Sequence, residues 1–225
     1  ARENRYRDSG SPFQARLMQR VIFIGSGGVA REVTSWASGM VDIAGYATLD
    51  AEEHARFQLP GQVFPDNITP DLAGTDLAVM AIGLPHVRKK LDARLSAAGF
   101  RFVSLIHPSA VVAANVVVGE GSIICPLVNV SPNVTLGRLT YLNFCIGIGH
   151  DAVLEDYVQV NPGVQIGGFA KIGKGALVGS GATVREGVKI GDNATIGSGS
   201  VVFATVRPDV TVMGNPAKRM RAFEA

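Results

Sequence analysis

A branched aliphatic residue recurs at every sixth position through the second half of the chain. The series runs without a break from Ile106 to Val202, and a small or β-branched residue stands two positions before each member, as Ala152, Val158 and Ala170 do. A period of six with two fixed apolar positions suits neither an α-helix nor a sandwich strand. It is typical of a parallel β-helix, in which each short strand forms one side of a prism. We therefore predict a β-helix of hexapeptide repeats over residues 105–205.

Residues 19–104 show a different pattern, in which short apolar runs alternate with amphipathic segments. Strands are expected at 21–24, 43–49, 77–82 and 102–106, and helices at 29–37 and 86–98. This alternation predicts a small open parallel sheet of the Rossmann-like, mononucleotide-binding kind. Residues 51–76 contain Pro60, Pro65 and Pro70 and give no clear element. The fold class is therefore an α/β domain followed by a parallel β-helix.

The two ends of a solenoid are open and need covers. We expect the N-terminal domain to cover one end. Residues 206–225, where Pro208 and Pro216 interrupt the repeat, should cover the other. Residues 1–18 are polar and aperiodic, and we expect a leader there that is either disordered or left over from expression.

Composition and charge exclude several classes of function. The formal net charge of +2 gives no electrostatic footprint for nucleic acid, and no run of about 18 apolar residues could span a membrane. No secretory signal is evident. Cys125 and Cys145 take different positions in the repeat, so we expect free thiols. These features predict a cytoplasmic protein.

The repeat also predicts which residues stack, because three hexads complete one turn and residues 18 apart lie on adjacent coils. One column of outward-facing residues is apolar over much of its length. We expect it to form an interface, most simply between copies of the chain. Scattered surface aliphatics are the alternative. The column contains Leu105, Ile123, Tyr141, Gln159, Leu177 and Thr195.

His150 is the one histidine of the repeats beyond the join between the domains at His107, and it lies at an expected turn between strands. The stacking rule places it one coil from Gly168, and Asp151 follows it in the chain. An imidazole can accept a proton from an attacking nucleophile, a carboxylate can orient it, and a bare glycine N–H can stabilise an oxyanion. These are the parts of an acyl-transfer site. A solvated turn histidine is the alternative.

A glycine-rich segment, Gly25, Ser26, Gly27 and Gly28, separates the first expected strand from the first helix, and Asp50 ends the second strand. N–H groups at such a helix start can bind phosphate, and the acid can bind a ribose hydroxyl. A nicotinamide-dependent oxidoreductase is one interpretation, but about 85 residues provide only half of a dinucleotide fold. A single nucleotide or a nucleotide sugar fits better. Glycines that only allow tight packing are a further alternative.

The third strand ends at Gly83, and Arg88 follows within the next expected helix. We expect Arg88 to reach a phosphate at the carboxyl edge of the sheet. A solvated basic helix surface is the alternative.

Several stretches together resemble the bacterial sugar acetyltransferases of the sialic acid O-acetyltransferase (NeuD) and PglD-like family. The resemblance covers residues 19–221 and implies a left-handed β-helix, a homotrimer, acetyl-CoA as acyl donor and a nucleotide-linked amino sugar as acceptor. It implies no metal. The matching stretches, in order, are VIFIGSGGVAREV, AIGLPHVRKKL, LIHPSAVV, LNFCIGIGHDAVLED, NPGVQIGG, IGKGALVGSGATVREGVKIGDNATIGSGSVV and VTVMGNPAKRM.

The same resemblance assigns roles to single residues. The catalytic base falls on His150, its acidic neighbour on Asp151, and a substrate contact on Asn143. Gly168 would donate its N–H to the thioester carbonyl. Gln159 stands where some members have a second histidine near the acetyl group. The CoA site falls on Gln159, Gly168, Ser180, Ala182, Gly214, Pro216, Ala217 and Lys218.

The combined prediction is an acetyl-CoA-dependent N-acetyltransferase that transfers the acetyl group directly to a nucleotide-linked amino sugar, with His150 as general base. O-acetylation of a sugar hydroxyl is the alternative reaction. A non-catalytic β-helix scaffold or ligand sensor is the alternative from another class.

Overall fold

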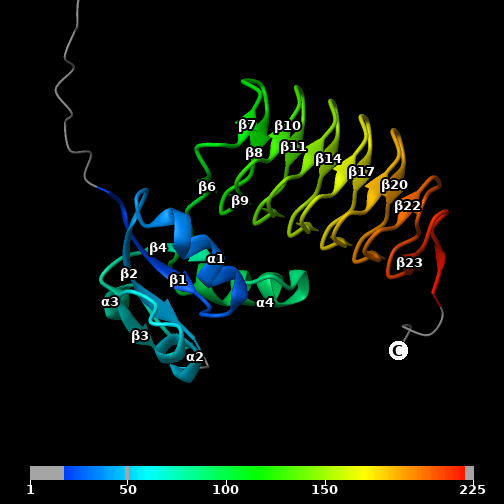
Figure 1. Ribbon diagram of the computed structural model, residues 1–225. Helices are drawn as coiled ribbons and strands as arrows, with labels where there is room; N and C mark the ends of the chain where they lie inside the picture. The colour runs from blue at the N-terminus through cyan, green and yellow to red at the C-terminus, as the bar shows by residue number, and fades with distance from the viewer. Residues whose placement is uncertain (1–17, 49–50, 221–225) are drawn as a thin grey trace, which may run out of the picture.

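The computed structural model describes residues 18–48 and 51–220 and consists of an α/β domain followed by a long β-helix (Figure 1). Asp50 and all of the expected leader except Met18 lie outside the described residues. Within the described ranges, no helix combines the length and the apolar surface that crossing a bilayer requires.

The α/β domain is built on a parallel sheet in the order β3-β2-β1-β4-β5. The centre of the sheet is β1, because its run of apolar residues can be buried on both faces. The order reverses between β1 and β4, which is where open α/β sheets bind ligands. The strands are β1 (Arg20–Ile24), β2 (Asp42–Ala47), β3 (Gln62–Phe64), β4 (Leu77–Met80) and β5 (Arg101–Phe102), and the helices are α1 (Gly28–Ala37), α2 (Ala51–Arg56), α3 (Pro70–Ala73) and α4 (Pro85–Ala97).

The segment without a predicted element, residues 51–76, contains α2, β3 and α3. Only Phe64 of β3 is buried, so this edge strand lacks the apolar run by which a buried strand is recognised. The expected strand over 102–106 is in fact two strands, since β5 ends the first sheet and β6 begins the β-helix.

Residues 105–202 form a left-handed parallel β-helix with one two-residue strand for each hexad. Face 1 consists of β6 (Leu105–Ile106), β9 (Ile123–Ile124), β12 (Tyr141–Leu142), β15 (Gln159–Val160), β18 (Leu177–Val178) and β21 (Thr195–Ile196). Face 2 consists of β7 (Val111–Val112), β10 (Asn129–Val130), β13 (Gly147–Ile148), β16 (Gln165–Ile166), β19 (Thr183–Val184) and β22 (Val201–Val202). Face 3 consists of β8 (Val117–Val118), β11 (Thr135–Leu136), β14 (Val153–Leu154), β17 (Lys171–Ile172) and β20 (Lys189–Ile190). We call the edges between faces corner 1–2, corner 2–3 and corner 3–1.

The strands pair as the period predicts. Tyr141 pairs with Gln159 on face 1, and Gly147 pairs with Gln165 on face 2, each 18 residues apart. The aliphatic member of each hexad points inward, and small residues such as Ala152 and Ala170 fill the remaining interior with no exposed surface. This close packing of stacked layers is the hydrophobic core of the prism.

Each corner depends on a residue with a left-handed backbone conformation. From Gly121 to Gly199, every sixth residue has a positive φ, and several of these residues are not glycines. Asp151, for example, has a φ of 59°. Such a conformation is unfavourable for a residue with a side chain, so it persists because the strands on both sides fix the corner. Asn and Asp tolerate it best.

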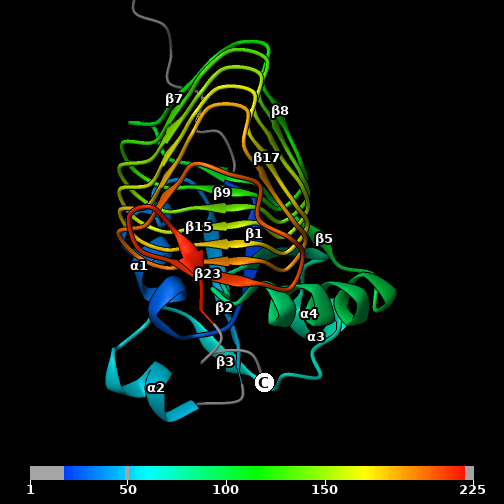
Figure 2. The ribbon, with the colours of Figure 1, turned by 90° about the vertical axis from the view of Figure 1, so that its right-hand side faces the viewer.

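The α/β domain packs on the side of the prism, against the first strands of face 1 (Figure 2). Leu105, Ile123, Tyr141 and Gln159 are therefore at most 5% exposed. The interface expected between copies along this column is in fact covered by the chain's own domain. The expectation that this domain closes an open end is also wrong, because Ile106 on the first coil remains 37% exposed.

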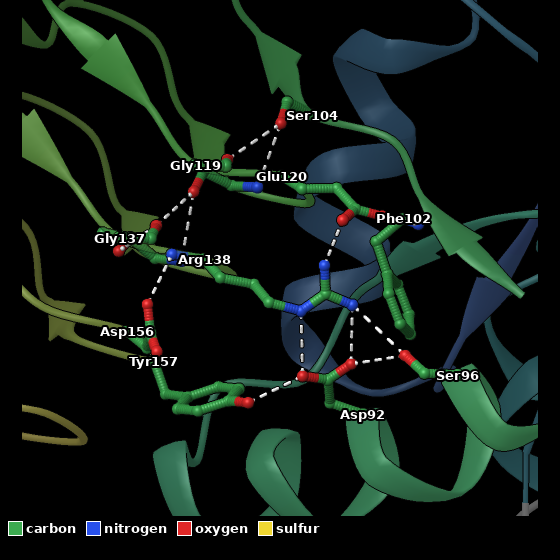
Figure 3. A network of polar contacts seen from close by, with 12 residues as sticks. Asp92, Ser96, Phe102, Ser104, Gly119, Glu120, Gly137, Arg138, Asp156 and Tyr157 are labelled. Atoms are coloured by element: carbon green, nitrogen blue, oxygen red, sulfur yellow. Dashed lines mark hydrogen bonds and ion pairs between the residues drawn. The ribbon is translucent and has the colours of Figure 1, made fainter.

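A polar network at corner 3–1 holds α4 against the prism (Figure 3). Arg138 donates to both oxygens of Asp92 at 2.8 and 3.0 Å, and the Tyr157 hydroxyl donates to the same carboxylate at 2.7 Å. Burial acts to raise the pKa of Asp92, but hydrogen bonds from Arg138, Tyr157 and Ser96 outweigh it and lower that pKa. The ionised carboxylate therefore stabilises the docked arrangement.

The C-terminal segment covers the far end of the prism. β23 (Thr211–Met213) pairs in parallel with β21, and β24 (Lys218–Arg219) folds back and pairs antiparallel with β23. Val206 and Val212 pack onto the prism core, and each is 6% exposed.

Candidate active site

His150 lies at corner 2–3, between β13 and β14, in contact with Gly168 of the next coil. A methyl group built on Gly168 would lie 2.9 Å from Cε1 and 3.0 Å from Nε2 of the imidazole. A side chain at position 168 would therefore displace the ring. Phe169 packs edge-on against the ring with centroids 5.0 Å apart. The His150 side chain is still 55% exposed, so a substrate can reach it.

The N–H of Gly168 makes no hydrogen bond within the part of the chain that the structure describes. At equivalent positions of corner 3–1, the N–H groups of Arg138 and Lys174 donate to Asp156 and Asp192 of the next coil, each at 3.0 Å. The residue 18 positions after Gly168, on the next coil, is Glu186, and its side chain accepts no hydrogen bond from the Gly168 N–H. A backbone donor thus remains available beside the imidazole, which is the arrangement an oxyanion site requires.

The imidazole is oriented by a carboxylate. Nδ1 of His150 lies 2.8 Å from Oδ2 of Asp151, and Nδ2 of Asn133 donates to Oδ1 of Asp151 at 3.0 Å. The hydrogen bonds from His150 and Asn133 lower the pKa of Asp151, so the carboxylate is ionised. An ionised acceptor at Nδ1 favours the tautomer with its proton there, which leaves Nε2 able to accept another.

A second candidate site is a cavity of about 590 Å³ at the carboxyl edge of the α/β sheet. It lies at the ends of β1, β2 and β4, around the reversal of strand order, where this type of sheet binds nucleotides. Predicted residues Gly25, Ser26 and Gly27 line it. The other lining residues are Ile24, Ala47, Thr48, Glu53, Asp66, Ile82, His86, Val87, Lys90, Leu91 and Arg94.

The glycines of this loop have different reasons to be glycine. Gly25 has a φ of +98°, and a methyl group on it would lie 2.5 Å from the Ile82 side chain. For Gly27 and Gly28, the nearest atom to such a methyl group is 3.8 Å away. Packing thus requires Gly25 alone. The space at Gly27 and Gly28 lets a ligand approach the first N–H groups of α1.

The basic residues that line this cavity do not include Arg88, the basic residue predicted from the sequence. His86, Lys90 and Arg94 line it at successive turns of α4. Arg94 is paired with Asp66 at 2.9 Å, whereas Lys90 is exposed. The spacing of four residues along an expected helix was the signal that could have identified this row.

Arg88 is directed away from the cavity and is 1% exposed between the two domains. It donates to Gln159 Oε1 at 2.8 Å and to the carbonyls of Tyr157 at 2.6 Å and Gly83 at 2.5 Å. Further bonds reach the carbonyls of Ile82 and Val158. The prediction that Arg88 reaches a phosphate is therefore corrected: it clamps the α/β domain to the prism. Gln159, expected in the CoA site, is 5% exposed and accepts from this clamp.

The remaining predicted residues gather at corner 1–2. Asn143 is 8% exposed and lies there beside Glu32 of α1. Ser180 lies at the same corner, and Gly214 N donates to Ser200 Oγ at 3.1 Å, which brings the terminal hairpin to it. Ala182 has no exposed surface, so its side chain belongs to the core. Pro216, Ala217 and Lys218 lie on the hairpin that ends in β24.

The histidine corner and the nucleotide cavity lie on opposite sides of one chain. The cavity belongs to the domain on face 1, and corner 2–3 is the edge of the prism opposite that face, at the apex between β7 and β8 in Figure 2. Asn143 at corner 1–2 is separated from His150 by the width of face 2. Among the described residues, no group of three His, Cys, Asp or Glu side chains is arranged to hold a metal ion.

Comparison with known sequences gives two relatives with stated activities. Residues 169–204 match the family described as bacterial transferase hexapeptide (six repeats). GDP-perosamine N-acetyltransferase of Escherichia coli O157:H7 is 35% identical over 40% of this chain and 41% of its own length. UDP-N-acetylbacillosamine N-acetyltransferase of Bacillus subtilis is 31% identical over 48% of this chain and 51% of its own. The matches thus span about half of those curated relatives.

Similarity to solved structures extends over both domains. PerB from Caulobacter crescentus, solved in complex with CoA and GDP-perosamine, superposes with a TM-score of 0.83 at 31% identity, over 89% of this chain and 96% of PerB. The same protein was also solved with a histidine replaced by asparagine or alanine. The acetyltransferase domain of PglB from Neisseria gonorrhoeae, solved with acetyl coenzyme A, gives a TM-score of 0.66 at 25% identity, over 90% of this chain and 100% of that domain.

Proposed function

Because the chain belongs to the hexapeptide-repeat sugar N-acetyltransferases, the family that includes PerB, we propose that it transfers an acetyl group from acetyl-CoA to the amine of a nucleotide-linked amino sugar. The observation that carries this proposal is the contact between the His150 imidazole and Gly168, beside an N–H without an acceptor in the described chain. The relatives act on GDP-linked and UDP-linked sugars, and the cavity of the α/β domain has room for either nucleotide.

The reaction follows from the groups at corner 2–3. The sugar amine attacks the thioester carbonyl while Nε2 of His150 removes a proton from the nitrogen. The carbonyl oxygen becomes an oxyanion and accepts the Gly168 N–H. When the tetrahedral intermediate collapses, the carbon–sulfur bond breaks, and the imidazolium returns its proton to the CoA thiolate. Asp151 stabilises the imidazolium, and no covalent enzyme intermediate is required.

The acceptor nucleotide would bind in the α/β cavity. The first N–H groups of α1, beyond Gly27, would receive a phosphate, and the exposed Lys90 would supply a positive charge. This cavity belongs to the domain on face 1, and His150 lies at corner 2–3, the edge of the prism opposite that face. A complete site therefore requires a second copy. We propose a homotrimer in which the nucleotide pocket of one copy meets corner 2–3 of its neighbour.

CoA would lie in the groove between copies. Ser180, Gly214, Pro216 and Lys218 gather at corner 1–2 and would line one wall, and Gly168 of the neighbouring corner 2–3 would face the thioester. Asn143, also at corner 1–2, would contact the sugar. The two cysteines form no disulfide, which agrees with a reducing compartment such as the cytoplasm.

An acetylation assay tests this function. Purified protein is incubated with acetyl-CoA and a panel of GDP-, UDP-, dTDP- and CMP-linked amino sugars, and release of the CoA thiol is measured. We expect turnover with at least one amino sugar and a kcat at least about a hundredfold lower for His150→Ala. Lack of turnover across the panel, or wild-type kcat in the variant, would refute the proposal.

A further inference from the structure

We propose that Asn133 is a positioning residue for the acetyl transfer, because it holds the Asp151 carboxylate in the orientation that fixes the tautomer of His150. This inference rests on the function proposed above and adds a residue from the preceding coil to the groups that act on His150. Asn133 lies 18 residues before Asp151, so the two side chains stack at corner 2–3.

The contacts form a directed chain of hydrogen bonds. Asn115 donates its side-chain N–H to Oδ1 of Asn133, which assigns the oxygen end of that amide. The Asn133 amino group therefore points at Asp151 and donates to Oδ1 at 3.0 Å. The other oxygen, Oδ2, is then left for Nδ1 of His150 at 2.8 Å. Each of the three bonds sets the orientation of the next group.

Asp151 depends on this external support. Its side chain is 33% exposed and forms hydrogen bonds with the side chains of His150 and Asn133. An exposed carboxylate held by a single bond can rotate about its side-chain torsions, and a rotated carboxylate no longer orients the imidazole. With Asn133 in place, both carboxylate oxygens have fixed donors.

Turn conformation is a competing reason for the residue at 133, because its φ is 62° and asparagine tolerates that region. The chain contains a matched case that separates the two reasons. Asn193 occupies the same position in its hexad, has a φ of 53°, and donates to Oδ1 of Asp209 at 3.0 Å. Neither residue next to Asp209 in the sequence is a histidine, and Asn193 lies at corner 3–1. Its loss therefore reproduces the turn effect without the catalytic effect.

The kinetic experiment compares Asn133→Ala with Asn193→Ala in the purified protein, together with Asp151→Asn and the double variant Asn133→Ala/Asp151→Asn. We expect Asn133→Ala to lower kcat by roughly three- to tenfold, the effect of losing one ordinary hydrogen bond at a solvent-exposed corner, with KM for both substrates unchanged. Asn193→Ala should keep wild-type kcat. In the Asp151→Asn background, loss of Asn133 should have no further effect, because both act through one path.

A spectroscopic experiment tests the same inference on the free protein, without turnover. The ¹⁵N chemical shifts of the His150 imidazole report which ring nitrogen carries the proton. We expect the Nδ1–H tautomer to dominate in the wild type and in Asn193→Ala. The Nε2–H tautomer should increase in Asn133→Ala. Asn115→Ala should give a smaller change in the same direction, and it carries the test if Asn133→Ala does not fold.

Different outcomes refute different claims. Wild-type kcat in Asn133→Ala, equal losses in Asn133→Ala and Asn193→Ala, or an unchanged tautomer population each overturn the positioning role. Multiplied losses in the double variant do so as well. If His150→Ala retains full activity, the proposed function fails. The tautomer measurement then still decides whether Asn133 orients the imidazole.

Discussion

Replacement of Arg88 by methionine tests whether this buried cation joins the domains or binds a phosphate. Methionine retains apolar volume but removes every donor. The carbonyl of Val158 keeps its bond from the Tyr141 N–H at 2.9 Å. The carbonyls of Ile82, Gly83 and Tyr157, and the side-chain carbonyl of Gln159, lose the one donor that the structure gives them.

Two opposing effects set the size of the change. The acceptors on Tyr157 and Gln159 are buried, and a buried acceptor left without a donor costs about 1–3 kcal/mol. The half-buried carbonyls of Ile82 and Gly83 lose an ordinary hydrogen bond of about 0.5–1.5 kcal/mol each, so the four losses cost roughly 3–9 kcal/mol together. Burial lowers the pKa of Arg88 to about 10, which corresponds to roughly 3 kcal/mol of desolvation that methionine does not carry. The lost hydrogen bonds outweigh the relieved desolvation, and we expect Arg88→Met to lower the free energy of unfolding by about 3 kcal/mol.

The single tryptophan of the chain provides the assay. Trp36 of α1 packs edge-on against His107 of the β-helix with ring centroids 5.3 Å apart, so its fluorescence reports whether the domains are docked. Urea unfolding followed at this residue should show an earlier transition in Arg88→Met. Lys89→Met, which changes the adjacent exposed residue, is the control and should match the wild type. Wild-type stability together with a tenfold loss of nucleotide affinity in Arg88→Met would show that Arg88 is a phosphate ligand after all.

Other predictions concern acid stability and the nucleotide loop. The folded-state pKa of Asp92 is lowered from an unfolded value of 3.8, so its ionised form stabilises the fold above that pH, and this contribution disappears as the pH falls through the folded value. Asp92→Asn should therefore lower the free energy of unfolding by about 3 kcal/mol at pH 7 and have little effect in strong acid; equal losses at both pH values in urea titrations would contradict this. Gly25→Ala should lower the melting temperature, because its positive φ and the contact with Ile82 leave no place for a methyl group. Gly27→Ala should keep the melting temperature and weaken nucleotide binding in calorimetry, and unchanged affinity would argue against a phosphate at this loop.

The repeat predicted the prism because each hexad carries its own evidence. The aliphatic at one position and the small residue two before it are both required by the interior, so the register of His150 against Gly168 followed from counting. The left-handed corner positions were missed, since leucine at 127 and aspartate at 151 carry no common side-chain signal for a positive φ. The stacked strands impose that conformation, and a local sequence does not record it.

Contacts between the domains could not be predicted in this way. An apolar column shows that something covers it, and in this protein the cover is the α/β domain and not a second copy. The place of Arg88, shortly after the third strand and at the carboxyl edge of the sheet, predicts a phosphate ligand. Its partners are carbonyls of Tyr157 and Val158, far away in the sequence, which any residue could supply. The four-residue spacing of basic residues along α4 is evident in the sequence. Only the position of the cavity shows that Lys90 and Arg94 belong to the proposed nucleotide site.

Mixed trimers test most directly whether the site is shared between copies. His150→Ala has an intact nucleotide pocket, and Lys90→Glu has an intact histidine corner but a reversed charge in the pocket. The two inactive variants are mixed in equal amounts, dissociated and reassembled. If the pocket of one copy works with His150 of its neighbour, about a quarter of the sites combine two intact halves, and about a quarter of wild-type activity should return. If activity stays at the level of the separate variants although mixed trimers have formed, pocket and histidine do not cooperate between chains.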